Sequence, residues 1–254
     1  MQSALPPEII DQIFSHLSHT PVRRKTLESC SHACRSFLHI ARAHLFRRIA
    51  IRSCADRTRL RLLIGQAPHL TSYARELYIN GFGFFMADDE VTAALEYFTN
   101  SSWHKLQEIT LDNLSWSNLS PRMQRVFLNL LASKSIHHVA LNSIDECPTT
   151  IVRHLSPGLK SLRINNTRFL QSFQRPSVPH LALKLDSMAI HFAASSYPEY
   201  PLDKSLLNFA KYVVDMTYLR TLKFSCNGAT WPAYQQMMQD ASGSLQHLYL
   251  QTSQ

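Results

Sequence analysis

Residues 106–111 have the sequence LQEITL, in which Leu106 is followed by Ile109 and then by Leu111. Ile109 and Leu111 alternate with the more polar residues Glu108 and Thr110, and this period of two is typical of a short β-strand that buries one face. The stretch therefore predicts a strand with one apolar face and one face that carries polar side chains.

The same spacing of apolar residues recurs from residue 46 to residue 250. The middle residues of the eight matches are Ile49, Leu77, Ile109, Val139, Leu162, Leu183, Leu222 and Leu248. Residues such as Met123, Val126, Phe127 and Leu130, at helical spacing, lie between the matches. Strands that alternate with helices form a parallel sheet through right-handed crossovers. A sandwich or barrel is not expected, because its tight hairpins need more than the six glycines present.

A strand and a helix in each unit of about 20–29 residues resemble the leucine-rich repeat, although several units here are longer. We therefore expect an α/β fold in which residues 51–254 form an irregular leucine-rich-repeat-like solenoid with a parallel, curved sheet. Residues between the buried ones would point to its concave face. The candidate target-binding residues on this face are Glu76, Tyr78, Glu108, Asp112, His138, Arg163, Lys184, Lys223 and Tyr249. Their mixed charges favour a protein or peptide partner over nucleic acid, whose phosphates need a uniformly basic surface.

The first fifty residues have a helical pattern instead. Pro6 and Pro7 suit the first turn of a helix, and Ile9, Ile10, Ile13, Phe14 and Leu17 then form one broad apolar stripe. A second stripe contains Leu27, Cys30, Cys34 and Phe37, and a third apolar segment covers residues 40–46. Three helices this short cannot bury all of their apolar surface, so a surplus face must meet the rest of the chain or a partner.

This segment resembles an F-box, most closely the versions common in fungi. The resemblance rests on Leu5-Pro6-x-Glu8-Ile9, on Thr26-Leu27-x2-Cys30-Ser31-x2-Cys34-Arg35-Ser36-Phe37 and on Ala43-x-Leu45-Phe46. It implies a three-helix F-box at residues 1–50 that docks a Skp-type adaptor and, through it, a cullin ligase. The residues that would contact the adaptor are Leu5, Pro6, Ile9, Ile13, Leu17, Leu27 and Cys30. The alternative is that these helices only cap the repeats.

No pattern typical of catalysis is present, and no cofactor or metal is expected. Cys30-x-His32-x-Cys34 lacks the second pair of ligands that a tetrahedral metal site needs. No apolar run is long enough to span a membrane, and the N-terminus does not resemble a signal peptide, so we expect a cytoplasmic or nuclear protein.

The expected function is therefore that of a non-catalytic substrate receptor in a ubiquitin ligase. A scaffold that binds the adaptor without a degradation target is the first alternative. A nucleic-acid binder is the second, because residues 1–60 contain ten Arg and Lys against four Asp and Glu and so carry +6 of the net charge of +8.

Overall fold

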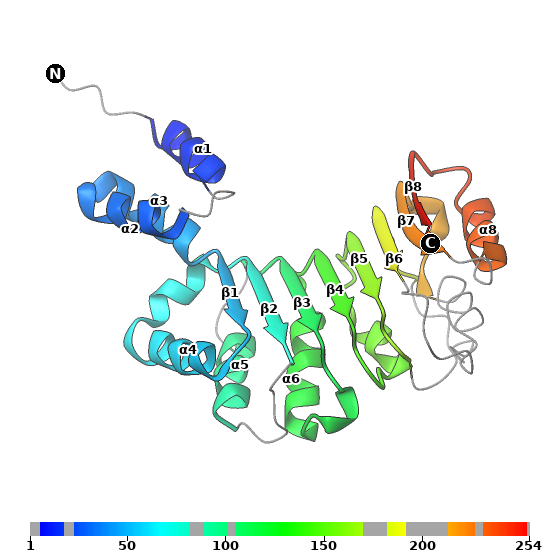
Figure 1. Ribbon diagram of the computed structural model, residues 1–254, viewed down its shortest axis with the longest axis horizontal. Coiled ribbons are helices and arrows are strands. Elements are labelled where there is room, and N and C mark those ends of the chain that lie inside the picture. The colour runs from blue at the N-terminus through cyan, green and yellow to red at the C-terminus, as the bar shows by residue number, and fades with distance from the viewer. Residues whose placement is uncertain are drawn as a thin grey trace.

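A computed structural model describes residues 6–17, 23–81, 89–100, 105–169, 182–191, 213–226 and 231–252 of the chain. Eight strands form one sheet in which each strand pairs in parallel with the next one along the chain, from β1 to β8 (Figure 1). The strands are β1 (Arg48–Ile51), β2 (Glu76–Asn80), β3 (Glu108–Asp112), β4 (His138–Asn142), β5 (Ser161–Asn165), β6 (Ser187–His191), β7 (Thr221–Cys226) and β8 (His247–Thr252). The chain is thus α/β with a parallel sheet, as the sequence predicts.

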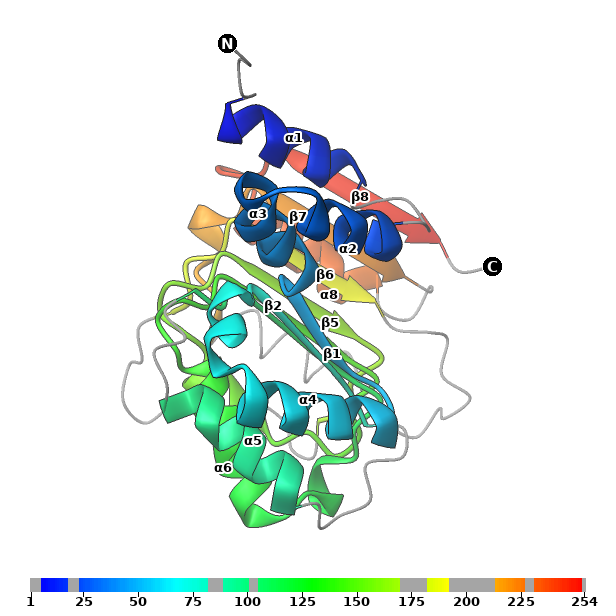
Figure 2. The same cartoon turned by 90° about the vertical axis from the view of Figure 1, so that its left-hand side faces the viewer.

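Helices connect the strands on one side of the sheet. They are α4 (Cys54–Gln66), α5 (Asp89–Asn100), α6 (Pro121–Leu131) and α8 (Trp231–Asp240), with short 3-10 helices η1 (Pro68–Tyr73), η2 (Trp116–Asn118), η3 (Thr149–His154) and η4 (Met216–Tyr218). Figures 1 and 2 show α4, α5 and α6 side by side against the same face of the sheet. The hydroxyl of Ser120 caps α6 by accepting from the N–H of Met123 at 3.2 Å, and α6 buries Phe127 and Leu130.

Successive strands share one register, which repeats the same side-chain positions across the sheet. Ile109 pairs with Leu77 on one side and with Val139 on the other, and all three are buried. Asn113, Ser143 and Asn166 directly follow β3, β4 and β5, and each has a positive φ of 47–51°. Their N–H groups donate to the backbone carbonyl oxygens of Asn142, Asn165 and His191 on the next strand. The residue after each of these strands therefore adds one hydrogen bond to the parallel ladder.

The predicted position of the sixth strand is wrong. The sequence placed it around Leu183, whereas β6 begins at Ser187 and buries Met188 and Ile190. Leu183 instead forms an isolated parallel bridge with Val214, and this bridge lies outside the eight strands. Leu183-Lys184-Leu185 has strand-like alternation and is buried at both leucines, which explains the error. Leu185-x2-Met188-x-Ile190 fits the full apolar spacing five residues later.

The described residues form two separate apolar cores. The larger one lies between the sheet and its helices, from Ile49 to Ala241. The smaller one lies among α1 (Pro7–Leu17), α2 (Arg23–Ala33) and α3 (Arg35–Leu45) and is built on Ile10, Phe14, Leu27 and Ala41. These three helices, hereafter the N-terminal module, lie at the β1 end of the sheet (Figures 1 and 2). The remainder is called the body.

Candidate functional site

Helix α1 has one broad apolar face, and only part of this face packs against the rest of the N-terminal module. Ile10 and Phe14 are 4% and 3% exposed and belong to the small core. Ile9 and Ile13 are 41% and 46% exposed. Because residues four apart share one face of a helix, Ile9 and Ile13 form a single exposed apolar stripe. Such a stripe on a folded module is a surface suited to a protein partner.

Contacts with α3 hold α1 in place, so the stripe is presented by a fixed helix. The imidazole Nε2 of His44 lies 2.8 Å from a carboxylate oxygen of Asp11, and His44 is 5% exposed. The ring of Phe14 packs edge-to-face on the rings of Phe37 and His44, with centroids 6.0 Å apart in both pairs. Aromatic pairs in this geometry stabilise a fold beyond the area they bury.

The predicted docking residues do not all lie on this exposed stripe. Pro6 is exposed next to it, and Leu17 is the last residue of α1. Leu27, which the sequence assigned to adaptor contact, is completely buried in the small core in this conformation. Cys30 is partly buried against the same core. Leu5 lies outside the described residues.

The face of the sheet opposite α4–α6 is called here the open face. Eight of the nine predicted target-binding residues are on strands at positions that point to it: Glu76, Tyr78, Glu108, Asp112, His138, Arg163, Lys223 and Tyr249. Lys184 is not among them, because the true β6 begins three residues later. Its ammonium group lies 3.1 Å from the hydroxyl of Tyr218 and 4.4 Å from that ring's centroid. The hydrogen bond to Tyr218 raises the pKa of Lys184.

At the β1–β3 end of the open face, aromatic, polar and charged side chains contact one another. The guanidinium carbons of Arg48 and Arg52 each lie 5.2 Å from the ring centroid of Tyr78, within reach of a cation–π interaction. The Tyr78 hydroxyl donates to the carboxylate of Asp112, which also accepts from the Asn80 amide at 3.1 Å. This end of the face is therefore an ordered network of aromatic and charged groups.

On β5–β7 the open face is cationic. Arg163 and Lys223 are exposed and are both in register with Ala189, which lies between them on β6. His191 lies two residues further along β6, where its register partners Asn165 and Ser225 are uncharged. Burial, followed by the positive charges of Arg163 and Lys223, lowers the pKa of His191. The predicted position of the sixth strand excluded His191 from the candidate residues, and the apolar spacing from Leu185 could have revealed it.

We expect Arg163→Gln and Lys223→Gln each to raise the pKa of His191, because each removes a like charge that disfavours the imidazolium. The pKa should stay below its ordinary value in both variants, since burial remains its largest cause. An NMR titration of the His191 imidazole measures this, with the exposed Arg153→Gln on η3 as the control. An unchanged His191 pKa in both variants would show that the three side chains do not face one another.

The described residues contain no group of three or more His, Cys, Asp or Glu side chains placed to hold a metal ion. No helix among them has the length and apolarity required to cross a membrane. Burial raises the pKa of the Cys147 thiol to about 12, so this cysteine is a packing residue and is protonated at neutral pH.

Comparison with known proteins gives one match. No curated protein and no solved structure matches the chain. A family model does match its N-terminus, over the three helices of the N-terminal module, of which α1 carries the exposed Ile9 and Ile13 stripe. By that match, residues 2–52 form an F-box-like domain.

Proposed function

We propose that this chain is the substrate-recognition subunit of a Skp–cullin–F-box-type ubiquitin ligase. The observation that carries the proposal is the exposed stripe of Ile9 and Ile13 on an F-box-like module that has its own core. In this proposal the stripe docks a Skp-type adaptor, and the open face of the body binds a target protein. A cullin would join through the adaptor.

The body is suited to the receptor role because it repeats one unit. The middle apolar residues of the eight strands are joined in one register from β1 to β8: Ile49, Leu77, Ile109, Val139, Leu162, Met188, Leu222 and Leu248. We interpret this as an irregular leucine-rich-repeat-like array, in which each strand adds exposed side chains to a long surface. The mixed charges of that surface favour a folded or extended protein over nucleic acid.

The chain itself would have no catalytic part in this role. Binding a target and an adaptor at the same time raises the effective concentration of the target near the enzymes that transfer ubiquitin. The simplest sites of action are the cytoplasm and nucleus, where such ligases work.

Proximity labelling in cells tests the receptor role. Cells would express either the intact chain or the variant Ile9→Asp plus Ile13→Asp, which removes the docking stripe while leaving the open face intact. We expect both chains to label the same target and the target's half-life to lengthen several-fold with the variant, because ligase recruitment is lost. Labelled proteins whose half-lives are equal in the two cell lines would instead indicate a scaffold without a degradation target.

Reversing the charge of two side chains on the open face separates target binding from adaptor binding. Arg163→Glu plus Lys223→Glu should abolish labelling of the target and retain recovery of the adaptor. Arg125→Glu plus Arg153→Glu, at exposed positions on α6 and η3, is the control with the same change in charge. Equal labelling by both double variants would exclude β5–β7 as the target surface.

A further inference from the structure

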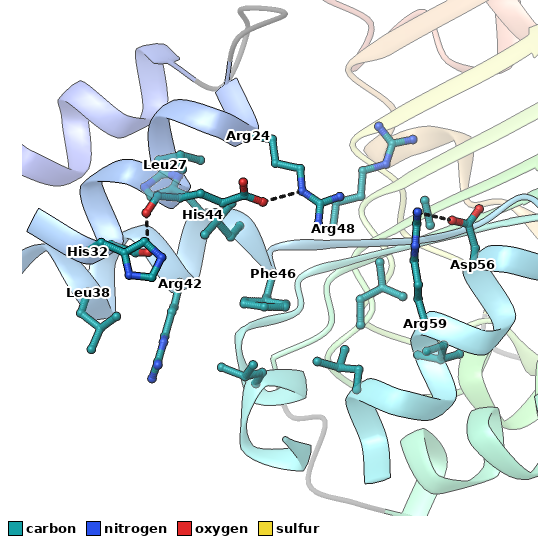
Figure 3. A pocket seen from close by; sticks show the side chains of 18 of the residues that line it. Arg24, Leu27, His32, Leu38, Arg42, His44, Phe46, Arg48, Asp56 and Arg59 are labelled. Carbon is teal, nitrogen blue, oxygen red and sulfur yellow. Dashed lines mark hydrogen bonds and ion pairs between the residues drawn. The ribbon is translucent and has the colours of Figure 1, made fainter. Parts of the chain in front are cut away.

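Five of the ten Arg and Lys residues of residues 1–60 line a groove between the N-terminal module and the body. Residues from α2 and α3 line one side, and residues from β1, α4 and η1 line the other, around a volume of about 1130 Å³ (Figure 3). Ile9 and Ile13 are not among the lining residues, so the groove is a surface separate from the docking stripe of α1.

The charges that line the groove do not balance. Five arginines, Arg24, Arg35, Arg42, Arg48 and Arg59, face two carboxylates, Glu28 and Asp56. Both carboxylates already have partners within the groove: Glu28 lies 2.8 Å from Arg24, and Asp56 lies 3.4 Å from Arg59. Arg48 contacts the ring of Tyr78. Among the described residues, neither Arg35 nor Arg42 forms an ion pair with a carboxylate. The groove therefore carries an uncompensated charge of about +3.

Part of the groove lining is apolar. Leu45 and Phe46 from the module side and Leu63 and Leu70 from the body side belong to this part, and all four are only partly buried. In Figure 3, Phe46 lies between the helices that carry Arg24 and Arg42 and the helix α4 that carries Asp56 and Arg59. A groove lined by both apolar side chains and cations can bury an apolar side chain of a partner and pair an acidic one at the same time.

We infer that this groove binds an acidic peptide segment that also carries apolar side chains, supplied by a partner protein. The volume is larger than the usual range of about 300–1,000 Å³ for small-molecule sites, which favours an extended chain. The excess of positive charge selects acidic residues, and the partly exposed leucines and Phe46 select apolar ones. Nucleic acid fits less well, because its phosphates find no partner in the apolar part of the lining. The inference does not depend on the proposed function.

Fluorescence anisotropy with the full chain tests the inference. The probes are three labelled molecules of equal length: a peptide that alternates Glu with Leu and Phe, an all-Glu peptide and oligodeoxythymidine. We expect the mixed peptide to bind about tenfold more tightly than the all-Glu peptide, because one well-buried apolar side chain contributes that much. Arg35→Glu plus Arg42→Glu should lower the affinity for the mixed peptide by about tenfold or more, because two charges that attract its acidic residues are replaced by two that repel them.

Matched variants decide the outcome. Arg125→Glu plus Arg153→Glu makes the same change in net charge away from the groove and should leave peptide affinity unchanged. Three results would each overturn the inference: an equal loss of peptide affinity in both double variants, equal affinity of the intact chain for the two peptides, or tighter binding of oligodeoxythymidine than of the mixed peptide. Thermal melting by circular dichroism verifies that the groove variant is folded, and the milder Arg42→Gln should still weaken binding measurably. Ile9→Asp plus Ile13→Asp should not affect the peptide, which separates this site from the adaptor surface.

Discussion

Replacing Ile9 and Ile13 by aspartate should abolish co-purification of a Skp-type adaptor with this chain and leave its thermal melting almost unchanged. The two side chains are 41% and 46% exposed, so neither contributes much to the small core. In a docked complex each would bury its exposed half, which is worth about 1 kcal/mol, and an unpaired carboxylate in its place would cost several kcal/mol more. Affinity should therefore fall by at least about 100-fold.

Leu62→Asp plus Leu248→Asp is the matched control for this pair. These leucines are 46% and 42% exposed, nearly the same as Ile13 and Ile9, but they lie on α4 and β8 of the body. The control introduces the same two charges and removes similar apolar surface, and it should not change adaptor recovery. Isothermal calorimetry with purified adaptor measures both variants. Adaptor binding that survives in the Ile9 and Ile13 variant would show that α1 is not the docking helix.

The alternating apolar pattern predicts most of the sheet because strand pairing follows from side-chain period. Seven of the eight matches coincide with β-strands. In these strands the predicted middle apolar residues pair with one another across the sheet. The sixth match fails because Leu183 and Leu185 are both buried in the large core ahead of β6, so their alternation resembles that of a strand. A local pattern shows that a residue is buried, and it does not show which element buries it.

The helices of the N-terminal module show the same limit. The stripe from Ile9 to Phe14 predicts one broad apolar face on α1. The structure divides this face between the small core, which takes Ile10 and Phe14, and the exposed surface, which keeps Ile9 and Ile13. Which residues fall on each side depends on where α3 packs, and His44 and Asp11, which join the two helices, are 33 residues apart in sequence. The groove between module and body depends on the same tertiary arrangement.

Two leucines occupy equivalent positions on different strands, and replacing each of them by alanine should change the free energy of unfolding by very different amounts. Leu162 on β5 and Leu248 on β8 both occupy the middle apolar position of their repeat. Leu162 is completely buried in the large core, whereas Leu248 is 42% exposed on a strand that, among the described residues, pairs only with β7. Leu162→Ala should lower the free energy of unfolding by about 3 kcal/mol, through lost transfer energy and the cavity left behind.

Leu248→Ala should lower the free energy of unfolding by less than about 1 kcal/mol, because much of the side chain is already in water and no enclosed cavity forms. Urea unfolding monitored by circular dichroism compares the two variants, provided that the dependence of the unfolding free energy on urea is the same in both. Similar losses in the two variants would contradict the exposure of β8 and would mean that Leu248 is covered in solution. The difference between the variants therefore measures how far the core of the repeated body extends toward its last described strand.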